Sequence, residues 1–464
     1  MAFDYDLIVI GVGPAGEKAA AQAAYFGKRV CAIERAPEPG GAGTHTGTVP
    51  SKTLRETAMY LSGYHSREMY GVAVELERDA TLPRLMSRKA AIVASESARI
   101  RENLQRHGIT YLQGLARFVD PHTVEVTSGA SRRRVTGDKI LIATGSRPAR
   151  PSSIDFGDPH IHDSDEILAI GTLPASLTIL GAGVIGCEYA CMFAALGVKV
   201  TLVDARDSLL AFLDGEMVEK LIASMRHMGI KIRLGARWSG VERDGGEVAT
   251  TFEHGPRVVS EHLLYAAGRE GRIEELNLAA VGVLPDKRGY LYVNDQYQTT
   301  VPNIFAAGDA IGFPALAATS MEQGRVAICH AFGFEYKQAV GELLPYGIYT
   351  IPEVSSIGET EESCQHIGTA YVIGRAQYAH NARGKIAGDT EGLLKLVVAR
   401  DSRKLIGVHV IGERATELVH VGQAIMHLGG KVDTLIDMVF NFPSLAEAYK
   451  YAAYDCLGKL AAKA

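Results

Sequence analysis

The sequence predicts an α/β protein that contains two parallel-sheet domains of the Rossmann type. Two stretches of the 464-residue chain, 7–35 and 177–205, can be superimposed at a constant offset of 170 positions. Each stretch reads as an apolar strand, a glycine-rich turn, a helix and a second apolar strand. Because this order of elements is the βαβ unit of a parallel sheet, its repetition predicts two separate sheets of the same design.

The glycines of each repeat predict a site for a dinucleotide. The first glycine allows a tight turn, the second lets a pyrophosphate approach the backbone, and the third lets the helix pack closely on the strand. The start of the helix offers free N–H groups and the positive end of the helix dipole to that pyrophosphate. A carboxylate at the end of each repeat is expected to accept hydrogen bonds from an adenosine ribose. These residues are Gly11, Gly13, Gly16 and Glu34 in the first repeat, and Gly181, Gly183, Gly186 and Asp204 in the second.

The composition is typical of a globular protein that does not bind nucleic acid or a membrane. Hydrophobic residues make up 47% of the chain, which is enough for several cores. The formal net charge is −5, so no basic field favours nucleic acid or an anionic membrane as a partner. The six cysteines are scattered without CxxC spacing, and this pattern argues against a disulfide framework and against a metal site. Because there is no basic leader and no apolar run of about 18 residues, we expect a soluble, cytoplasmic protein.

Several segments resemble those of the pyridine nucleotide–disulfide oxidoreductases, the family of glutathione reductase and lipoamide dehydrogenase. The segments similar to FAD-binding elements are LIVIGVGPAG (7–16), GGAGTHTGTVPSK (40–52), KILIATGSRP (139–148) and IFAAGDA (304–310). Those similar to the interface domain are YTIPEVSSIGETE (349–361) and LIGVHVIGERATELVH (405–420). The resemblance implies a discontinuous FAD-binding domain over 1–150 and 276–340, an NAD(P)-binding domain over 151–275, and an α+β dimerisation domain over 341–464. It therefore also implies a homodimer or higher homo-oligomer.

The resemblance also implies which residues hold the two kinds of nucleotide. FAD would be held by Gly11, Gly13, Pro14, Ala15, Gly16, Glu34, Arg35, Gly40, Gly41, Ala42, Gly43, Thr44, Lys52, Gly114, Ala116, Ala143, Thr144, Gly145, Gly308 and Asp309. NAD(H) or NADP(H) would be held by Gly181, Gly183, Val184, Ile185, Gly186, Glu188, Asp204, Arg206 and Gly268.

The sequence departs from the disulfide-reducing members of the family at three positions. The two redox cysteines are replaced by Gly43 and Thr48, and the acid–base histidine near the C-terminus is replaced by Phe442. These losses agree with one another, since without a thiolate there is nothing for the histidine to deprotonate. A hydride delivered to the flavin would then leave from the flavin itself, which implies transhydrogenation from NADPH to NAD⁺. Two alternatives stay open: an NAD(P)H oxidase or quinone diaphorase, and a non-catalytic nucleotide-binding sensor.

The candidate catalytic residues are Lys52, Glu188 and Thr48. The resemblance implies that Lys52 and Glu188 form an ion pair beside flavin N5, where a cation stabilises the reduced ring. Thr44 and Thr48 could offer hydroxyls to the flavin or serve only at a helix start. Asp309 could bind the ribityl or phosphate region or act as a helix N-cap. His45 is near the same site, although polar loop histidines are common.

Three further interpretations concern the second repeat. Asp204 favours the free 2′-hydroxyl of NAD, whereas Arg206 could pair with the 2′-phosphate of NADP, so the sequence favours dual specificity or carries incidental loop charges. Cys187 and Cys191 lie four residues apart on the predicted helix and are expected to pack in the core. Val184 stands where several disulfide reductases carry a tyrosine gate, which implies a less obstructed nicotinamide path.

Overall fold

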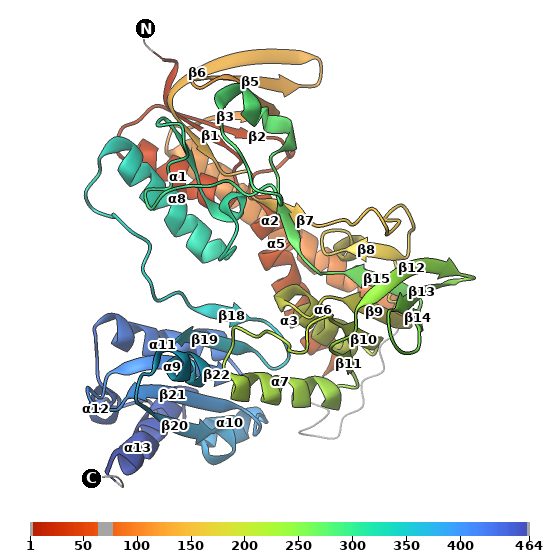
Figure 1. Cartoon of the computed structure of the whole chain (residues 1–464), viewed down its shortest axis with the longest axis vertical. Coiled ribbons are helices and arrows are strands. Elements are labelled where there is room, and N and C mark those ends of the chain that lie inside the picture. The colour runs from red at the N-terminus through yellow and green to blue at the C-terminus, as the bar shows by residue number, and fades with distance from the viewer. Residues whose placement is uncertain (1–2, 64–77, 462–464) are drawn as a thin grey trace.

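The computed structural model describes residues 3–63 and 78–461. In Figure 1 the N-terminal sheet lies at the top, the C-terminal sheet lies at the bottom, and a third group of strands lies to one side between them. Within the described residues, no helix combines the length and the apolar character that crossing a membrane would require.

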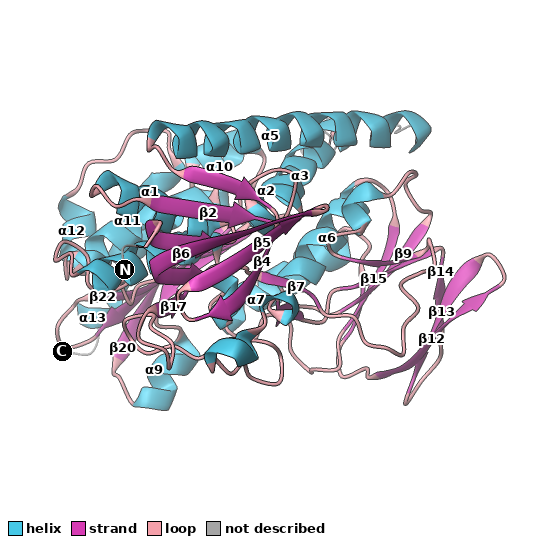
Figure 2. Cartoon of the chain, turned by 90° about the horizontal axis from the view of Figure 1, so that it is seen from above, coloured by secondary structure: helices cyan, strands magenta, loops and turns pink. Residues whose placement is uncertain are grey.

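The first sheet is the predicted Rossmann-type sheet. Its parallel strands run in the order β3 (Thr110–Gln113), β2 (Val30–Glu34), β1 (Tyr5–Ile10), β6 (Ser131–Ile142) and β17 (Ile304–Ala306). The first half of β6 instead pairs antiparallel with β5 (Thr123–Ser128), which pairs with β4 (Leu115–Asp120). Its helices are α1 (Pro14–Tyr25), α2 (Gly41–His45), α3 (Thr48–Ser62), α5 (Arg78–Arg106) and α8 (Ala317–Phe332). Figure 2 shows α5 running alongside this sheet.

The second sheet repeats the design of the first. Its parallel strands run in the order β11 (Lys231–Arg233), β10 (Lys199–Val203), β9 (Ser176–Leu180), β15 (His262–Tyr265) and β8 (Ile161–Asp163). Helices α6 (Val184–Ala195) and α7 (Gly215–His227) belong to this part of the chain. A small antiparallel sheet of β12 (Trp238–Asp244), β13 (Glu247–Phe252) and β14 (Val258–Ser260) extends from it. The chain enters and leaves through an antiparallel ribbon of β7 (Ser146–Pro148) and β16 (Arg269–Gly271).

The C-terminal part has the α+β character that the resemblance implied. Its antiparallel sheet runs in the order β18 (Tyr346–Ile348), β19 (Val354–Gly358), β22 (Leu405–Ile411), β21 (Leu393–Ala399) and β20 (Tyr371–Gln377). Its helices are α9 (Glu361–Ile367), α10 (Ala382–Ala387), α11 (Ala415–His427), α12 (Val432–Asp437) and α13 (Ala448–Ala461). Short 3₁₀ turns cover Ile167–Ala169, Glu274–Leu276, Leu278–Val281, Gly308–Ile311, Tyr378–His380 and Leu445–Glu447.

One apolar core joins the three parts. Leu54 and Ala58 of α3, Cys187 and Cys191 of α6, and Val354 of β19 are buried in the same cluster. Both cysteines are therefore core residues, as the sequence predicts. Because residues from all three parts share this core, the elements that surround the junction are held in fixed positions relative to one another.

Candidate nucleotide and hydride-transfer site

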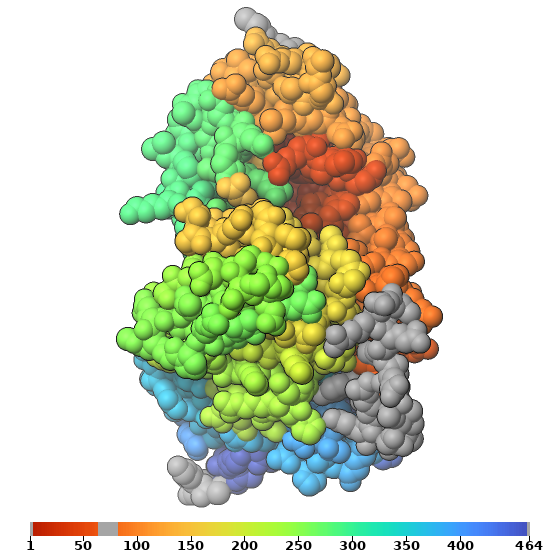
Figure 3. All heavy atoms as spheres, turned by 90° about the vertical axis from the view of Figure 1, so that its right-hand side faces the viewer, coloured from red at the N-terminus to blue at the C-terminus, as the bar shows by residue number. Residues whose placement is uncertain are grey.

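A cavity of about 820 Å³ opens where the three parts meet. In Figure 3 the surface is hollowed where the red N-terminal segment meets the orange and yellow segments. The predicted residues that line the cavity are Gly11, Gly13, Pro14, Ala15, Glu34, Arg35, Gly41, Ala42, Gly43, Thr48, Lys52, Gly114, Ala116, Ala143, Thr144, Gly145, Val184, Ile185, Glu188, Gly308 and Asp309. The structure therefore brings both sides of the candidate site, from the first repeat and from α6, into one space.

Nine predicted residues do not line this cavity. They are Gly16, Gly40, Thr44, Gly181, Gly183, Gly186, Asp204, Arg206 and Gly268. Thr44 is buried within α2, where its side chain packs so closely on Gly40 that a Cβ there would lie 2.6 Å from Thr44 Oγ1. Thr44 thus packs within the turn of α2, and its contact with the flavin stays a prediction. Gly268 precedes β16, and its carbonyl accepts a hydrogen bond from the Ala149 N–H at 3.1 Å.

The three glycines of the first repeat differ in whether the fold has space for a side chain. A Cβ on Gly11 would lie 2.4 Å from the carbonyl oxygen of Ala143, and one on Gly16 would lie 1.9 Å from that of Gly11. A Cβ on Gly13 would meet only the Cα of Gly41, at 3.7 Å, and Gly13 has an ordinary φ of −81°. The fold therefore requires Gly11 and Gly16, whereas the lack of a side chain at Gly13 leaves space beside the start of α1.

The second repeat has the same arrangement. A Cβ on Gly186 would lie 1.8 Å from the carbonyl oxygen of Gly181, which itself has a φ of +113°. Gly183 has a φ of −79°, and a Cβ there would meet nothing within 4 Å. The first N–H groups of α6, like those of α1, donate no hydrogen bond to an N-cap side chain, because the N-caps are Gly183 and Gly13. Both helix starts are therefore open to an anion, as a dinucleotide pyrophosphate requires.

The two terminal carboxylates brace their own glycine turns. Glu34 accepts hydrogen bonds from the Val12 N–H at 2.8 Å and the Ala36 N–H at 2.9 Å. Asp204 accepts the equivalent bonds from the Ala182 N–H at 2.7 Å and the Arg206 N–H at 2.8 Å. Since these pairs are also related by the offset of 170, the repeat extends to individual hydrogen bonds.

The two charges expected to choose between NAD and NADP are paired with each other. Arg206 donates from Nε to Asp204 Oδ1 at 2.9 Å and from Nη2 to Asp204 Oδ2 at 2.7 Å. Burial raises the pKa of the Asp204 carboxyl, but the hydrogen bonds from Arg206 and Ala182 and the charge of Arg206 together hold it below its usual value. The Asp204 side chain is 8% exposed and that of Arg206 is 58% exposed. Arg206 can therefore turn outward more readily than Asp204.

The predicted ion pair between Lys52 and Glu188 is present. Lys52 Nζ on α3 donates to Glu188 Oε2 on α6 at 2.5 Å, and Glu188 Oε1 accepts from the Tyr349 N–H at 2.9 Å. The Lys52 ammonium also lies 4.9 Å from the centre of the Tyr349 ring. The pair faces the cavity together with Gly43 and Thr48, so neither position that could carry a redox cysteine supplies a sulfur atom there.

The cysteines of the chain do not replace the missing thiols. All six are unpaired and buried. Burial raises the pKa of Cys191 to about 12 and that of Cys187 well above its usual value. Because the thiolate is the reactive form, neither of these side chains is suited to redox exchange. Within the described residues, no group of three or more His, Cys, Asp or Glu side chains is arranged to hold a metal ion.

Several contacts at the cavity could not be predicted from the motifs. Asp309 Oδ2 accepts a hydrogen bond from the Ser146 hydroxyl at 2.8 Å, and Arg269 Nε donates to the Ser146 oxygen at 2.8 Å. These partners come from the ribbon of β7 and β16, and no sequence spacing indicates them. Phe212 and Tyr349 also line the cavity. Both provide aromatic surface, and of the two only Phe212 lies outside the quoted motifs.

Polar atoms without partners indicate that the cavity is built for a polar, anionic ligand. Thr144 Oγ1 and Arg272 Nε are buried and have no hydrogen-bond partner. Burial, followed by the nearby Arg35, lowers the pKa of the Arg272 guanidinium. A buried cation near other cations is stabilised by an anion, and a buried hydroxyl by a ligand hydrogen bond. These features, with the space left by Gly13, fit FAD.

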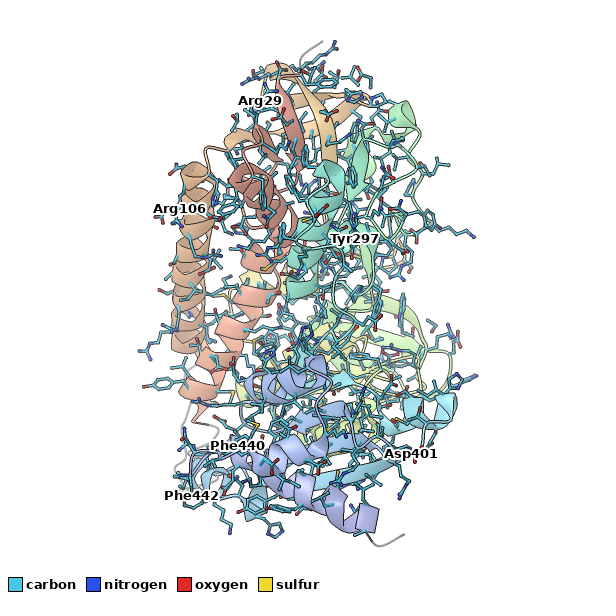
Figure 4. All side chains as sticks on the ribbon, turned by 90° about the vertical axis from the view of Figure 1, so that its left-hand side faces the viewer. Arg29, Arg106, Tyr297, Asp401, Phe440 and Phe442 are labelled. Atoms are coloured by element: carbon cyan, nitrogen blue, oxygen red, sulfur yellow. The ribbon has the colours of Figure 1, made fainter. Side chains whose placement is uncertain are left out.

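Three candidate positions remain, of which His45 and Thr48 line the cavity and Phe442 does not. His45 Nε2 lies 3.0 Å from the Pro39 carbonyl oxygen. Thr48 begins α3 and also lines the cavity. Phe442 is 74% exposed on the C-terminal part, whereas the nearby Phe440 is partly buried against the core of that part (Figure 4).

Comparison with known proteins identifies the family of the chain. Residues 5–324 match the family described as pyridine nucleotide-disulphide oxidoreductase, and residues 344–453 match its dimerisation domain. The soluble pyridine nucleotide transhydrogenase of Mycobacterium tuberculosis is 47% identical over 461 residues, covering 99% of this chain and 98% of the relative. That of Colwellia psychrerythraea is 40% identical over 462 residues, covering 99% of both chains.

Solved structures give the same result. The HOCl-induced flavoprotein disulfide reductase RclA of Escherichia coli, in its Cu(II) complex, has a TM-score of 0.88 at 27% identity and covers 98% of this chain and 99% of its own. LpdA from Mycobacterium tuberculosis has a TM-score of 0.88 at 28% identity and covers 97% of this chain and 99% of its own. The chain therefore belongs to the pyridine nucleotide-disulphide oxidoreductase family.

Proposed function

We propose that this protein is an FAD-dependent transhydrogenase that converts NADPH and NAD⁺ into NADP⁺ and NADH, reversibly. The observation that carries the proposal is the pair of sulfur-free positions, Gly43 and Thr48, on the cavity wall beside Lys52 and Glu188. Without a dithiol to receive electrons from the cofactor, a second nicotinamide is the natural acceptor. Relatives that are 40–47% identical over nearly their whole length carry the name soluble pyridine nucleotide transhydrogenase.

The first repeat would hold FAD, which supplies a ring that accepts a hydride and gives it up again. The start of α1, with the space left by Gly13, suits the pyrophosphate. Glu34 lines the cavity and is suited to the adenosine ribose. Asp309, held by Ser146, is suited to a hydroxyl or phosphate near the middle of the cofactor.

Lys52 and Glu188 would set the electrostatics at the reacting end. The Lys52 ammonium places a positive charge at the cavity wall, where it favours negative charge that develops on the ring. Glu188 accepts from both Lys52 and the Tyr349 N–H, so the ammonium is held in one place. Thr48 offers a hydroxyl on the same wall. The preorganised charge lowers the reorganisation needed when the hydride arrives.

The second repeat would bind NAD(H) and NADP(H) in turn. The start of α6, with Gly183, suits the pyrophosphate, and Val184 and Ile185 continue from there into the cavity. Asp204 suits the ribose of NAD(H), and Arg206 suits the 2′-phosphate of NADP(H). Both nucleotides can therefore use one path to the same ring.

The C-terminal part and the unpaired cysteines support a homodimeric cytoplasmic enzyme. The match to a dimerisation domain over residues 344–453 supports association through the C-terminal part, on which Val439 and Phe442 are 92% and 74% exposed. Six unpaired cysteines favour a reducing compartment. We assign the FAD-binding part to 1–150 and 276–340, the NAD(P)-binding part to 151–275 and the interface part to 341–464.

The second glycine of each repeat, Gly13 or Gly183, provides a test that distinguishes the FAD site from the NAD(P) site. The Gly13→Ala variant should fold but purify without bound FAD, because the added methyl group occupies space meant for the pyrophosphate and not for the protein. The Gly183→Ala variant should retain FAD but resist reduction by NADPH and NADH. Gly171→Ala is the matched control, since a Cβ there also meets nothing within 4 Å.

Each outcome has a distinct meaning. Wild-type holoprotein whose flavin is reduced by NADPH and reoxidised by NAD⁺ supports the transhydrogenase. Reoxidation only by oxygen or a quinone would make the protein an oxidase or diaphorase, and no reduction at all would make it a sensor. Full FAD retention in Gly13→Ala would contradict the assignment of the first repeat.

A further inference from the structure

The loop between β10 and α7 exposes one aromatic side chain into the cavity. Of its large apolar residues, Leu209, Leu210 and Leu213 are 0%, 1% and 5% exposed, whereas Phe212 is 49% exposed. Phe212 lines the cavity, and its ring centre lies 5.3 Å from that of Tyr346 at the start of β18. In Figure 1 the yellow-green chain that leads into α7 runs beside β18. An exposed aromatic ring at a ligand cavity is surface that a ligand can cover.

This loop is held firmly at its far end. Asp214 is fully buried, and its Oδ1 accepts a hydrogen bond from Lys395 Nζ on β21 at 2.8 Å. Lys395 is 1% exposed and also contacts Glu216 and Glu361. Asp214 is the N-cap of α7 and accepts from the Glu216 N–H at 3.2 Å. The exposure of Phe212 therefore belongs to an anchored loop and not to a loose one.

The same loop begins at the residues expected to bind the adenosine end of a nicotinamide nucleotide. Asp204 and Arg206 lie at its start, and Phe212 lies six residues after Arg206. Six residues span at most about 20 Å when extended, which is enough for one loop to follow a dinucleotide. At the other end of the loop, the Phe212 ring lies beside Tyr346, three residues before Tyr349. The Tyr349 N–H donates to Glu188, and the Tyr349 ring lies beside the Lys52 ammonium.

We propose that Phe212 is a nucleotide-positioning residue that packs on the nicotinamide ring of NAD(H) and NADP(H) alike. This inference rests on the proposed function. It adds a contact to the nicotinamide end, which NAD(H) and NADP(H) have in common. Val184 and Ile185, from the start of α6, line the cavity with aliphatic groups, so Phe212 supplies an aromatic face from another element. An oxidised nicotinamide is a cation, and an aromatic face attracts it.

The test compares ligands with and without a nicotinamide ring. In FAD-loaded protein, Phe212→Ala should weaken the binding of NAD⁺ and NADP⁺ by similar factors of about 3- to 30-fold, because an aromatic contact is lost. Binding of ADP-ribose, which lacks the nicotinamide, should be unchanged within about twofold, and Phe212→Tyr should bind like wild type. Phe26→Ala, at an exposed ring of the first domain, is the control. Dissociation constants come from calorimetry on the holoprotein.

The outcomes separate this proposal from the one it rests on. Equal weakening of ADP-ribose and NAD⁺ would show that the variant disturbs the loop, and unchanged NAD⁺ and NADP⁺ affinities would show that Phe212 is only cavity wall. Either result overturns the proposal. If wild-type holoprotein binds neither NAD⁺ nor NADP⁺, the proposed function itself fails.

Discussion

Replacing Arg206 by alanine should weaken the binding of NADPH much more than that of NADH. The Arg206 guanidinium donates to Asp204 from Nε and Nη2, at 2.9 and 2.7 Å. Asp204 itself is fixed by the N–H groups of Ala182 and Arg206. For the 2′-phosphate of NADPH to bind, the arginine side chain leaves the carboxylate while Asp204 stays in place.

The size of the effect follows from this exchange of partners. A charge-assisted hydrogen bond to the phosphate is worth about 1.5–3 kcal/mol. Breaking an exposed ion pair costs about 0.2–1 kcal/mol, and the 58% exposure of Arg206 places its pair in that class. The difference, about 0.5–2.8 kcal/mol, corresponds to a roughly 2- to 110-fold weaker binding of NADPH. NADH makes no phosphate contact at this position, so its affinity should change by less than about threefold.

Anaerobic reduction of the bound flavin measures both affinities in one assay. The observed rate is followed against NADPH or NADH concentration, and the half-saturating concentrations are compared between wild type and variant. Arg257→Ala is the matched control, because Arg257 is 57% exposed and pairs with Asp244 in the same domain. Equal weakening of NADPH and NADH, or no change in either, would refute the assignment of Arg206 to the phosphate.

Three further outcomes are expected. Lys395→Met should destabilise the protein by about 3–5 kcal/mol in urea unfolding, because it leaves the buried Asp214 carboxylate without its cation. Burial and the neighbouring His162 lower the pKa of His262 to about 4, below the value of about 6.5 in an unfolded chain. Unfolding therefore takes up a proton in this range, so stability should fall as the pH drops from about 6.5 towards 4, and His262→Gln should flatten that profile. Replacing Cys187 and Cys191 together by alanine should leave the hydride-transfer rate per bound FAD unchanged, since both thiols are buried with raised pKa values; a selective loss of turnover would reveal a thiol role.

Much of the fold could be predicted because the repeat is local in sequence. Glycines, strand and helix lie within 29 residues in each copy, so spacing alone places Gly11 and Gly181 at equivalent turns. The hydrogen bonds that Glu34 and Asp204 accept from their own turns are seen only in the structure, since the spacing indicates a ribose as their partner. The α+β character of the C-terminal part could be predicted only through resemblance.

The rest of the site depends on how distant segments meet. Ser146 and Asp309 are 163 residues apart and Arg269 is 123 residues from Ser146, so no periodicity links them. Phe212 reads as one more apolar residue in LLAFL, and only the buried state of its neighbours marks it out. Thr44 belongs to a quoted motif, but its burial within the turn of α2 depends on packing that the motif does not specify.

The central claim is that the hydride enters and leaves through the flavin without a thiol. The direct measurement is anaerobic double-mixing stopped flow on the FAD-loaded protein, in which one equivalent of NADPH is followed by excess NAD⁺. The flavin absorbance should bleach with NADPH and recover fully with NAD⁺, with NADH formed in equal amount and no oxygen present. Bleaching that recovers only when oxygen or a quinone is admitted would contradict the account.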